Sequence, residues 1–145
     1  MSHPTFPSEG LRSFFERFQS LSADADALAA MYAASFIMAG PGGAQIVPSA
    51  ALLGAIPKRK QLMDSAGHRT TTLVGFEEQL LTDRYSLVRA EWRWEFQPMQ
   101  HPAVDLTLPA TFIVDRGGEE PRIILYMNQQ DIAAALRERG LLPAT

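Results

Sequence analysis

The chain contains no cysteine, and this absence excludes disulfide bonds, thiolate metal sites and thiol nucleophiles. It also lacks a long apolar run, because stretches such as 28–37 fall far short of the roughly 20 residues that a membrane span needs. The 13 lysines and arginines nearly balance the 16 aspartates and glutamates, for a net charge of −3. Such a charge disfavours general binding to nucleic acid or to an anionic membrane. The first residues show no basic flank before an apolar core, and we therefore expect a cytoplasmic protein without a secretory signal.

The 145 residues, 46% of them hydrophobic, suit a single domain over 1–145 in which residues 1–7 form an irregular arm. Apolar residues at helical spacing predict a helix from Ser8. A second, alanine-rich helix is expected to begin at Ser22 or Asp24 and to run through Tyr32.

The segment 36–67 contains several glycines and prolines that end or interrupt its secondary structure. A short strand is expected at 36–38, and the glycine- and proline-rich turn 39–43 ends it. A third helical stretch covers 48–66 and stops at Gly67. Because Pro57 lies inside this stretch, we expect a kink or two short helices.

After Gly67 the apolar pattern changes from the helical period to strict alternation. Four successive strands are predicted, at 68–81, 85–96, 105–115 and 122–128, followed by a last helix at 131–139. On the second of these strands one face is apolar and should pack against the helices; it consists of Val88, Ala90, Trp92, Trp94 and Phe96. This order of helices, antiparallel strands and a terminal helix predicts an α+β fold.

Three segments carry a resemblance to a known family: 22–38, the tryptophan-bearing strand 87–92, and 111–131. In their order and spacing they resemble the nuclear transport factor 2-like superfamily, and within it the SnoaL-like group that includes polyketide cyclases and ketosteroid isomerases. The resemblance implies a cystatin-like cone, in which a curved antiparallel sheet wraps around N-terminal helices and leaves a cavity at its open end. It also implies a homodimer formed through the sheet.

The resemblance does not fix a reaction, because members of this superfamily differ in chemistry. Ketosteroid isomerases carry Glu-Asp-Pro-x-Gly with the aspartate as general base, and the matching segment here is Ala-Gly-Pro-Gly-Gly at 39–43. Gly40 therefore stands at the position of the base. A glycine cannot abstract a proton, and this isomerase activity is disfavoured.

Other acid–base groups can be proposed from their positions. Asp105 begins a strand after a long loop, and His101 lies in that loop near the expected cavity mouth. Tyr126 could polarise an oxygen. Each also has an ordinary structural explanation, as a strand-start carboxylate, a loop histidine or a core tyrosine. His68, at the start of the first predicted strand, could reach the cavity rim or remain a partly exposed histidine.

Three further features are more simply structural. The histidines are scattered, and we expect no metal site and no cofactor. The basic cluster 58–60 is interpreted as a solvated helix face. Glu78 shares the alternation of buried neighbours, which would bury it, although a bulge near Gly75 would reverse that face.

The aromatic content is the strongest functional signal. Seven residues on cavity-lining elements of the resembled fold are predicted to bind ligand: Tyr32, Phe36, Met38, Trp92, Trp94, Tyr126 and Asn128. Such a lining suits a small, largely apolar or aromatic molecule, such as a polyketide- or terpenoid-like compound. With the resemblance, it predicts a small-molecule-binding protein, and cyclase or dehydratase chemistry if it is an enzyme. The alternative is a non-catalytic accessory protein that dimerises or binds ligand and whose cavity is filled by Trp92 and Trp94.

Overall fold

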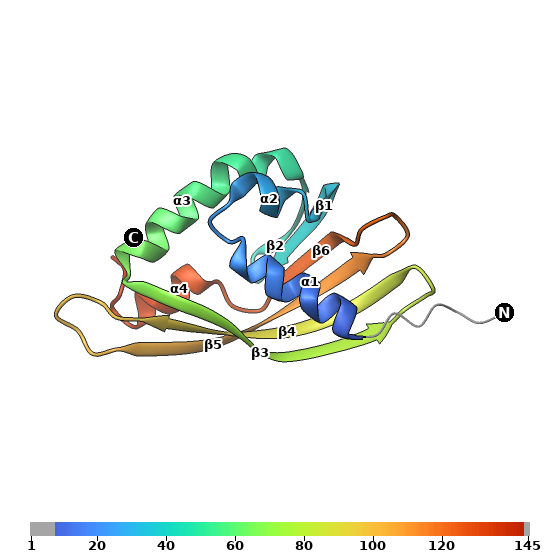
Figure 1. Ribbon diagram of the computed structural model, residues 1–145. Helices are drawn as coiled ribbons and strands as arrows, with labels where there is room; N and C mark the ends of the chain where they lie inside the picture. Colours follow the sequence, from blue (N-terminus) through green and yellow to red (C-terminus); the bar gives the residue numbers. More distant parts are fainter. Residues whose placement is uncertain (1–7, 144–145) are drawn as a thin grey trace.

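One curved sheet of six strands forms the frame of the molecule, and its helices cover the concave face (Figure 1). The computed structural model describes residues 8–143, so the arm expected at 1–7 lies outside the described residues. The strand order is β2-β1-β6-β5-β4-β3, and all neighbours are antiparallel except β1 and β6, which are parallel. The strands are β1 Tyr32–Gly40, β2 Gly43–Pro48, β3 His68–Leu80, β4 Tyr85–Phe96, β5 Val104–Asp115 and β6 Arg122–Asn128. The α+β prediction is confirmed.

The helices lie in two groups over this sheet. Their bounds are α1 Ser8–Ser20, α2 Ala25–Ala29, α3 Leu52–Ser65 and α4 Ile132–Glu138, with a short 3-10 turn η1 at Ser49–Ala51. Helix α1 packs along β3, and α3 crosses above the end of the sheet where α4 lies (Figure 1). Two of the helices are capped by aspartate, because the Asp24 and Asp131 side chains accept hydrogen bonds from the backbone at the starts of α2 and α4.

The prediction of a helix through Tyr32 is wrong. Helix α2 ends at Ala29, and Tyr32 is the first residue of a nine-residue strand. Tyr32 pairs with Ile123, so β1 lies inside the sheet between β6 and β2. Strand pairing outweighs the weak helix preference of the alanines around it. Strand β2, which was not predicted, pairs with β1 around the tight turn 40–43.

Helix α3 is one element, so of the two alternatives expected at Pro57 the division into two short helices is wrong. Pro57 is exposed, whereas Leu52, Ile56 and Met63 bury other sides of the helix against the protein. Tertiary packing therefore holds the helix together despite the missing backbone donor. Gly67 follows with a φ of 84°, as its predicted role of helix stop requires.

Two clusters of buried side chains form the core. The larger one surrounds Phe15 of α1, and its aromatic members come from α1, β1, β4 and β5. The smaller one joins the end of α3 to α4 and includes Phe96 and Leu136. Trp94 is partly buried and packs against both clusters. It marks the place where the two cores meet.

The bulge considered near Gly75 is present in β3, but it turns Val74 outward and leaves Glu78 on the inner face. Leu73 pairs with Trp92 and Gly75 with Glu91, which leaves Val74 as an extra residue. Leu73 is buried and Val74 is 50% exposed. The half-buried Glu78 accepts a hydrogen bond from the fully buried Ser86 at 2.8 Å, which places its carboxylate on the inner face.

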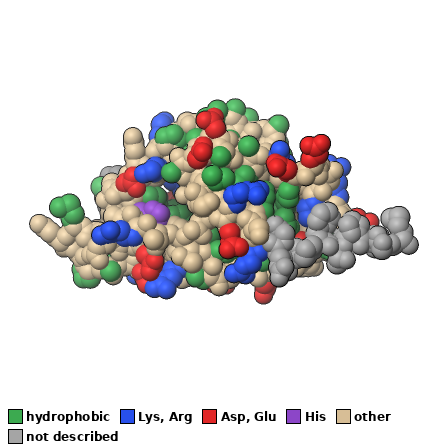
Figure 2. All heavy atoms as spheres, in the orientation of Figure 1, with side chains coloured by type: hydrophobic (Ala, Val, Ile, Leu, Met, Phe, Trp, Pro, Cys, Tyr) green, Lys and Arg blue, Asp and Glu red, His purple; other side chains and the backbone are tan. Residues whose placement is uncertain are grey.

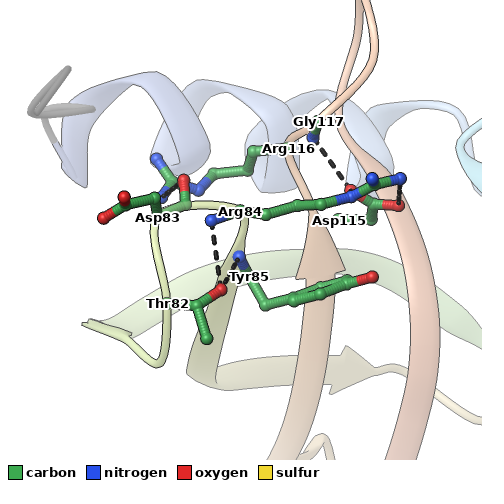
Figure 3. Close-up of polar contacts among 7 residues, drawn as sticks. All are labelled: Thr82, Asp83, Arg84, Tyr85, Asp115, Arg116 and Gly117. Carbon is green, nitrogen blue, oxygen red and sulfur yellow. Dashed lines mark hydrogen bonds and ion pairs between the residues drawn. The ribbon is translucent and has the colours of Figure 1, made fainter.

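A polar corner joins the β3–β4 turn to the β5–β6 turn (Figure 3). The Arg84 side chain donates two hydrogen bonds to Asp115, at 2.7 and 2.9 Å, and the Gly117 N–H donates to the same carboxylate at 2.8 Å. The hydrogen bond from Arg84 holds the pKa of Asp115 below its ordinary value. The corner ties together the two loops at one end of the sheet.

Candidate functional site

A group of polar and aromatic side chains lies where the two cores meet. The Arg59 guanidinium of α3 lies over the Trp94 ring, with its Cζ atom 5.4 Å from the ring centroid. The ring of His68, from the start of β3, lies 5.4 Å from that of Trp94 and 5.5 Å from that of Phe96. Figure 2 shows a histidine side chain in view at the surface between α3 and β3, close to basic side chains. We call Arg59, His68 and Trp94 the junction cluster.

His68 is held in place from two elements. Its Nε2 is hydrogen-bonded to the Thr71 hydroxyl at 2.7 Å, and the Thr71 carbonyl accepts a hydrogen bond from Gln19 at the end of α1. Burial lowers the pKa of His68, and the positive charges of Lys60 and Arg59 act in the same direction. The imidazole is therefore kept neutral to a lower pH than an exposed histidine.

This shift predicts a pH-dependent stability. The pKa of His68 is 6.5 when unfolded and lower when folded, so the unfolded chain binds more protons between the two values. The contribution of His68 is fully present above pH 6.5 and is lost as the pH falls below it. Thermal unfolding of the wild type between pH 8 and pH 5 should therefore show a steeper loss of Tm than that of His68→Gln.

The exposed His101 supplies the matched control for this measurement. His101→Gln should follow the wild-type profile, because its ring lies in a solvated loop. Parallel profiles for the wild type and His68→Gln would contradict the proposed burial of His68.

A second group of aromatic rings lies in the larger core, and we call Phe18, Tyr32 and Trp92 the aromatic wall. Tyr32 and Trp92 are buried, and both lie about 6 Å from the ring of the partly exposed Phe18, at 6.0 and 5.9 Å. Burial raises the pKa of Tyr32, and the nearby Tyr126 raises it further while the charge of Arg59 opposes the rise.

The indole N–H of Trp92 is the polar group that stands out in this wall. Its nitrogen is buried and has no hydrogen-bond partner among residues 8–143. A buried donor without a partner is costly, and such a group marks a place where an acceptor would bind favourably.

The predicted ligand-binding residues divide between two places. Tyr32, Phe36, Trp92, Trp94 and Tyr126 belong to or pack against the larger core around the aromatic wall. Met38 also packs against this core, and with Asn128 it lines a hollow of about 420 Å³ beside the β1–β2 turn.

Gly40 also lines this hollow. A Cβ atom built on Gly40 would be 3.0 Å from the Asn128 Oδ1 atom. Any side chain at this position would therefore displace Asn128, and the carboxamide lies where a larger residue at 40 would point.

The structure does not bring the proposed acid–base residues together. Asp105 is exposed and forms an ion pair with Arg93 at 2.5 Å on the outer face of the sheet, since its neighbour Leu106 points into the core. His101 is exposed in the β4–β5 loop, where its Nδ1 contacts the Pro102 carbonyl at 3.0 Å. Tyr126 alone faces the interior, with its ring 4.8 Å from that of Phe112.

The prediction that 58–60 form a solvated helix face is confirmed, because all three residues are exposed, but sequence reasoning missed the contact of Arg59 with Trp94. Its position does carry a signal: Arg59 follows Ile56 by three residues and precedes Met63 by four, so all three share one face of α3. Ile56 and Met63 are buried whereas Arg59 between them is exposed, so its long side chain reaches Trp94 from the solvent side.

Within the described part of the chain, no three histidine, aspartate or glutamate side chains come close enough to hold a metal ion. Nor does any helix there have the length and apolarity needed to cross a membrane.

Comparison with solved structures identifies the fold. An NTF2-like protein with a cystatin-like fold from Novosphingobium aromaticivorans superposes with a TM-score of 0.69 at 18% identity, covering 92% of this chain and 87% of its own. The beta subunit of benzoate 1,2-dioxygenase from Burkholderia mallei gives a TM-score of 0.69 at 17% identity, covering 92% of this chain and 95% of its own. A scytalone dehydratase-like protein from Novosphingobium aromaticivorans gives 0.64 at 10% identity, covering 82% and 80%.

The chain therefore has the NTF2-like cone fold, as the sequence resemblance implied. At these identities the similarity concerns the fold, and the neighbours' names do not assign an activity. No protein-family model and no curated protein matches the sequence.

Proposed function

We propose that the aromatic interior of the cone, entered at the junction cluster, binds a small, flat, largely apolar molecule. The observation that carries this proposal is the buried Trp92 N–H, a donor without a partner in a wall of aromatic rings. A ligand with a ring and a hydrogen-bond acceptor would use both features. Because Asp105 and His101 lie away from the interior, the proposal concerns binding and includes no catalytic step.

Binding of neutral bicyclic aromatic compounds, with 2-naphthamide as the first probe, tests this function. A ligand that binds only the folded state at ~100 times its Kd stabilises it by about 2.7 kcal/mol, which a thermal-shift assay detects easily. Quenching of Trp92 and Trp94 fluorescence gives a second measure. Trp92→Phe keeps an aromatic ring but loses the donor, and we expect about tenfold weaker binding.

Tyr85→Phe is the matched control, because Tyr85 lies at the other end of β4. Its affinity should equal that of the wild type. If no aromatic probe shifts the Tm or quenches the fluorescence, the binding function is wrong.

A second candidate function is that of a non-catalytic accessory protein with a filled interior. It is favoured by the packing of α1, because Phe15 has no exposed surface and its ring lies 4.6 Å from that of Phe112. Under this alternative the aromatic wall is only core. The thermal-shift experiment separates the two, since a filled core binds no probe.

We further propose that the chain forms a homodimer through the outer face of the sheet. One apolar row crosses five neighbouring strands in register, and it consists of Ile46, Ile37, Leu125, Ile113 and Leu87. Ile46 is 77% and Ile37 39% exposed in the single chain. A continuous apolar row of this kind is typical of an interface, and a two-fold axis would bury it against its own copy.

Ile113→Glu tests the dimer. A charge in the middle of the row should convert the dimer to a monomer, as measured by light scattering coupled to size-exclusion chromatography. Thr107→Glu, on the same strand and face but outside the row, should leave the dimer intact. A wild-type monomer, or an intact dimer in Ile113→Glu, would refute the proposal.

A further inference from the structure

The charges around the junction cluster are unbalanced. Arg59 forms no ion pair within residues 8–143, whereas Lys60, the next residue, pairs with Asp64 at 2.6 Å. Asp64 is the acidic group whose charge acts on His68, and Lys60 already neutralises it. The Arg59 charge therefore remains unpaired where its guanidinium lies over Trp94.

The geometry of Arg59 suits a bound anion. Its guanidinium lies over an aromatic ring, which keeps the planar group in one orientation. A guanidinium held in this way can offer two parallel N–H groups to a carboxylate. Arg59 is exposed, so a ligand can reach its guanidinium from the solvent.

The groups deeper in the wall add hydrogen-bond donors. The Trp92 N–H has no partner among the residues described, and the rings of Trp92 and the buried Tyr32 both lie about 6 Å from that of Phe18, at 5.9 and 6.0 Å. Together these groups provide an exposed cation over Trp94, aromatic rings beside it and a buried donor on Trp92, the next inward-facing residue of β4.

We propose that the ligand of this site is an aromatic carboxylate, whose carboxylate binds Arg59 while its ring lies against Trp94. This inference rests on the proposed function and adds the charge of the ligand to it. The ring places apolar surface on the aromatic wall, and the anionic group compensates the unpaired Arg59.

The hollow of about 680 Å³ at the edge of β3 offers no comparable preference for an anion. Arg12 and Arg89 are accompanied there by Glu77 and Glu78. Its mixed charges select no ligand of one sign. It serves as an internal comparison, since an anion that bound there would respond to Arg12.

The experiment compares two probes of nearly identical shape, 2-naphthoate and 2-naphthamide, on the full-length protein. Wild type should bind the carboxylate more tightly than the amide, and added salt should weaken only the carboxylate. Arg59→Gln should reduce carboxylate affinity at least about tenfold and leave the amide unchanged. Arg59→Lys keeps the positive charge but loses the two parallel N–H donors, so its carboxylate affinity should lie between those of Arg59→Gln and the wild type.

Two variants serve as matched controls. Lys58→Gln removes an exposed positive charge one residue away on the same helix, and Arg12→Gln removes one at the β3 hollow. Both should bind the two probes as the wild type does. Circular dichroism confirms that each variant is folded, and the salt dependence of the wild type gives a test that needs no variant.

The outcomes separate this inference from the function on which it rests. If 2-naphthamide binds as tightly as 2-naphthoate and Arg59→Gln affects neither, the carboxylate preference is wrong and apolar binding stands. If the affinity falls in Arg12→Gln instead, the anion binds at the edge of β3 and the inference is overturned. If neither probe binds the wild type, both proposals fail.

Discussion

Replacing Phe15 with alanine should destabilise the protein by about 3–5 kcal/mol, the largest effect expected from a single substitution here. Phe15 has no exposed surface, and its ring contacts those of Phe14, Phe18, Phe76, Trp92 and Phe112. The substitution removes a ring from the middle of the larger core, and these neighbours are too large and too firmly placed to fill the space. Urea unfolding followed by tryptophan fluorescence measures the loss.

Two variants control for this prediction. Phe15→Leu keeps most of the apolar volume and should lose clearly less stability, so it remains folded even where Phe15→Ala does not. Phe18→Ala lies one turn further along α1, where the side chain is only partly buried, and should also cost less. An equal loss in Phe15→Ala and Phe18→Ala would contradict the central position of Phe15.

Replacing Gly67 with alanine should cost at least about 2 kcal/mol, for two separate reasons. Its φ of 84° is a backbone conformation that alanine adopts only with strain. In addition, an added Cβ atom would lie 2.5 Å from the Gln97 carbonyl oxygen, which belongs to the backbone and cannot simply rotate away. The same connection is fixed by a hydrogen bond from the Gln97 N–H to the Gly67 carbonyl at 2.8 Å.

Gly140 separates the two causes. Its φ is 77°, but no atom lies within 4 Å of an added Cβ atom. Gly140→Ala should therefore show only the backbone strain, about 1–2 kcal/mol. Chemical denaturation of both variants checks this difference. Equal losses would mean that the contact with Gln97 contributes nothing.

The sequence predicted the antiparallel strands well because each has one buried face. Val88, Ala90 and Trp92 alternate with charged residues, and that alternation is sufficient to place β4. Strand β1 was assigned too short because Tyr32 follows an alanine-rich helix without a turn signal. Its strand structure depends on pairing with Ile123, some ninety residues away, which no local pattern contains.

The candidate site was predictable in its aromatic residues and less so in its polar ones. Trp92 and Trp94 follow from alternation along β4. Asp105 was assigned to the cavity edge by its place after a loop, although the buried Leu106 beside it implies the outer face. Arg59 was hidden among three basic residues, and only its helical spacing from Ile56 separates it from its neighbours.

The parallel pairing of β1 with β6 also bears on how the chain folds. The two strands are neighbours in the sheet but far apart in the sequence, because β2, β3, β4 and β5 all come between them along the chain. A contact of such high sequence separation forms late and slows folding. During synthesis β1 can pair with β2 at once, but it can join the rest of the sheet only after β6 has been synthesised. A nascent chain that stalls before residue 122 would expose the free edges of both β1 and β5, which is the state most prone to aggregation.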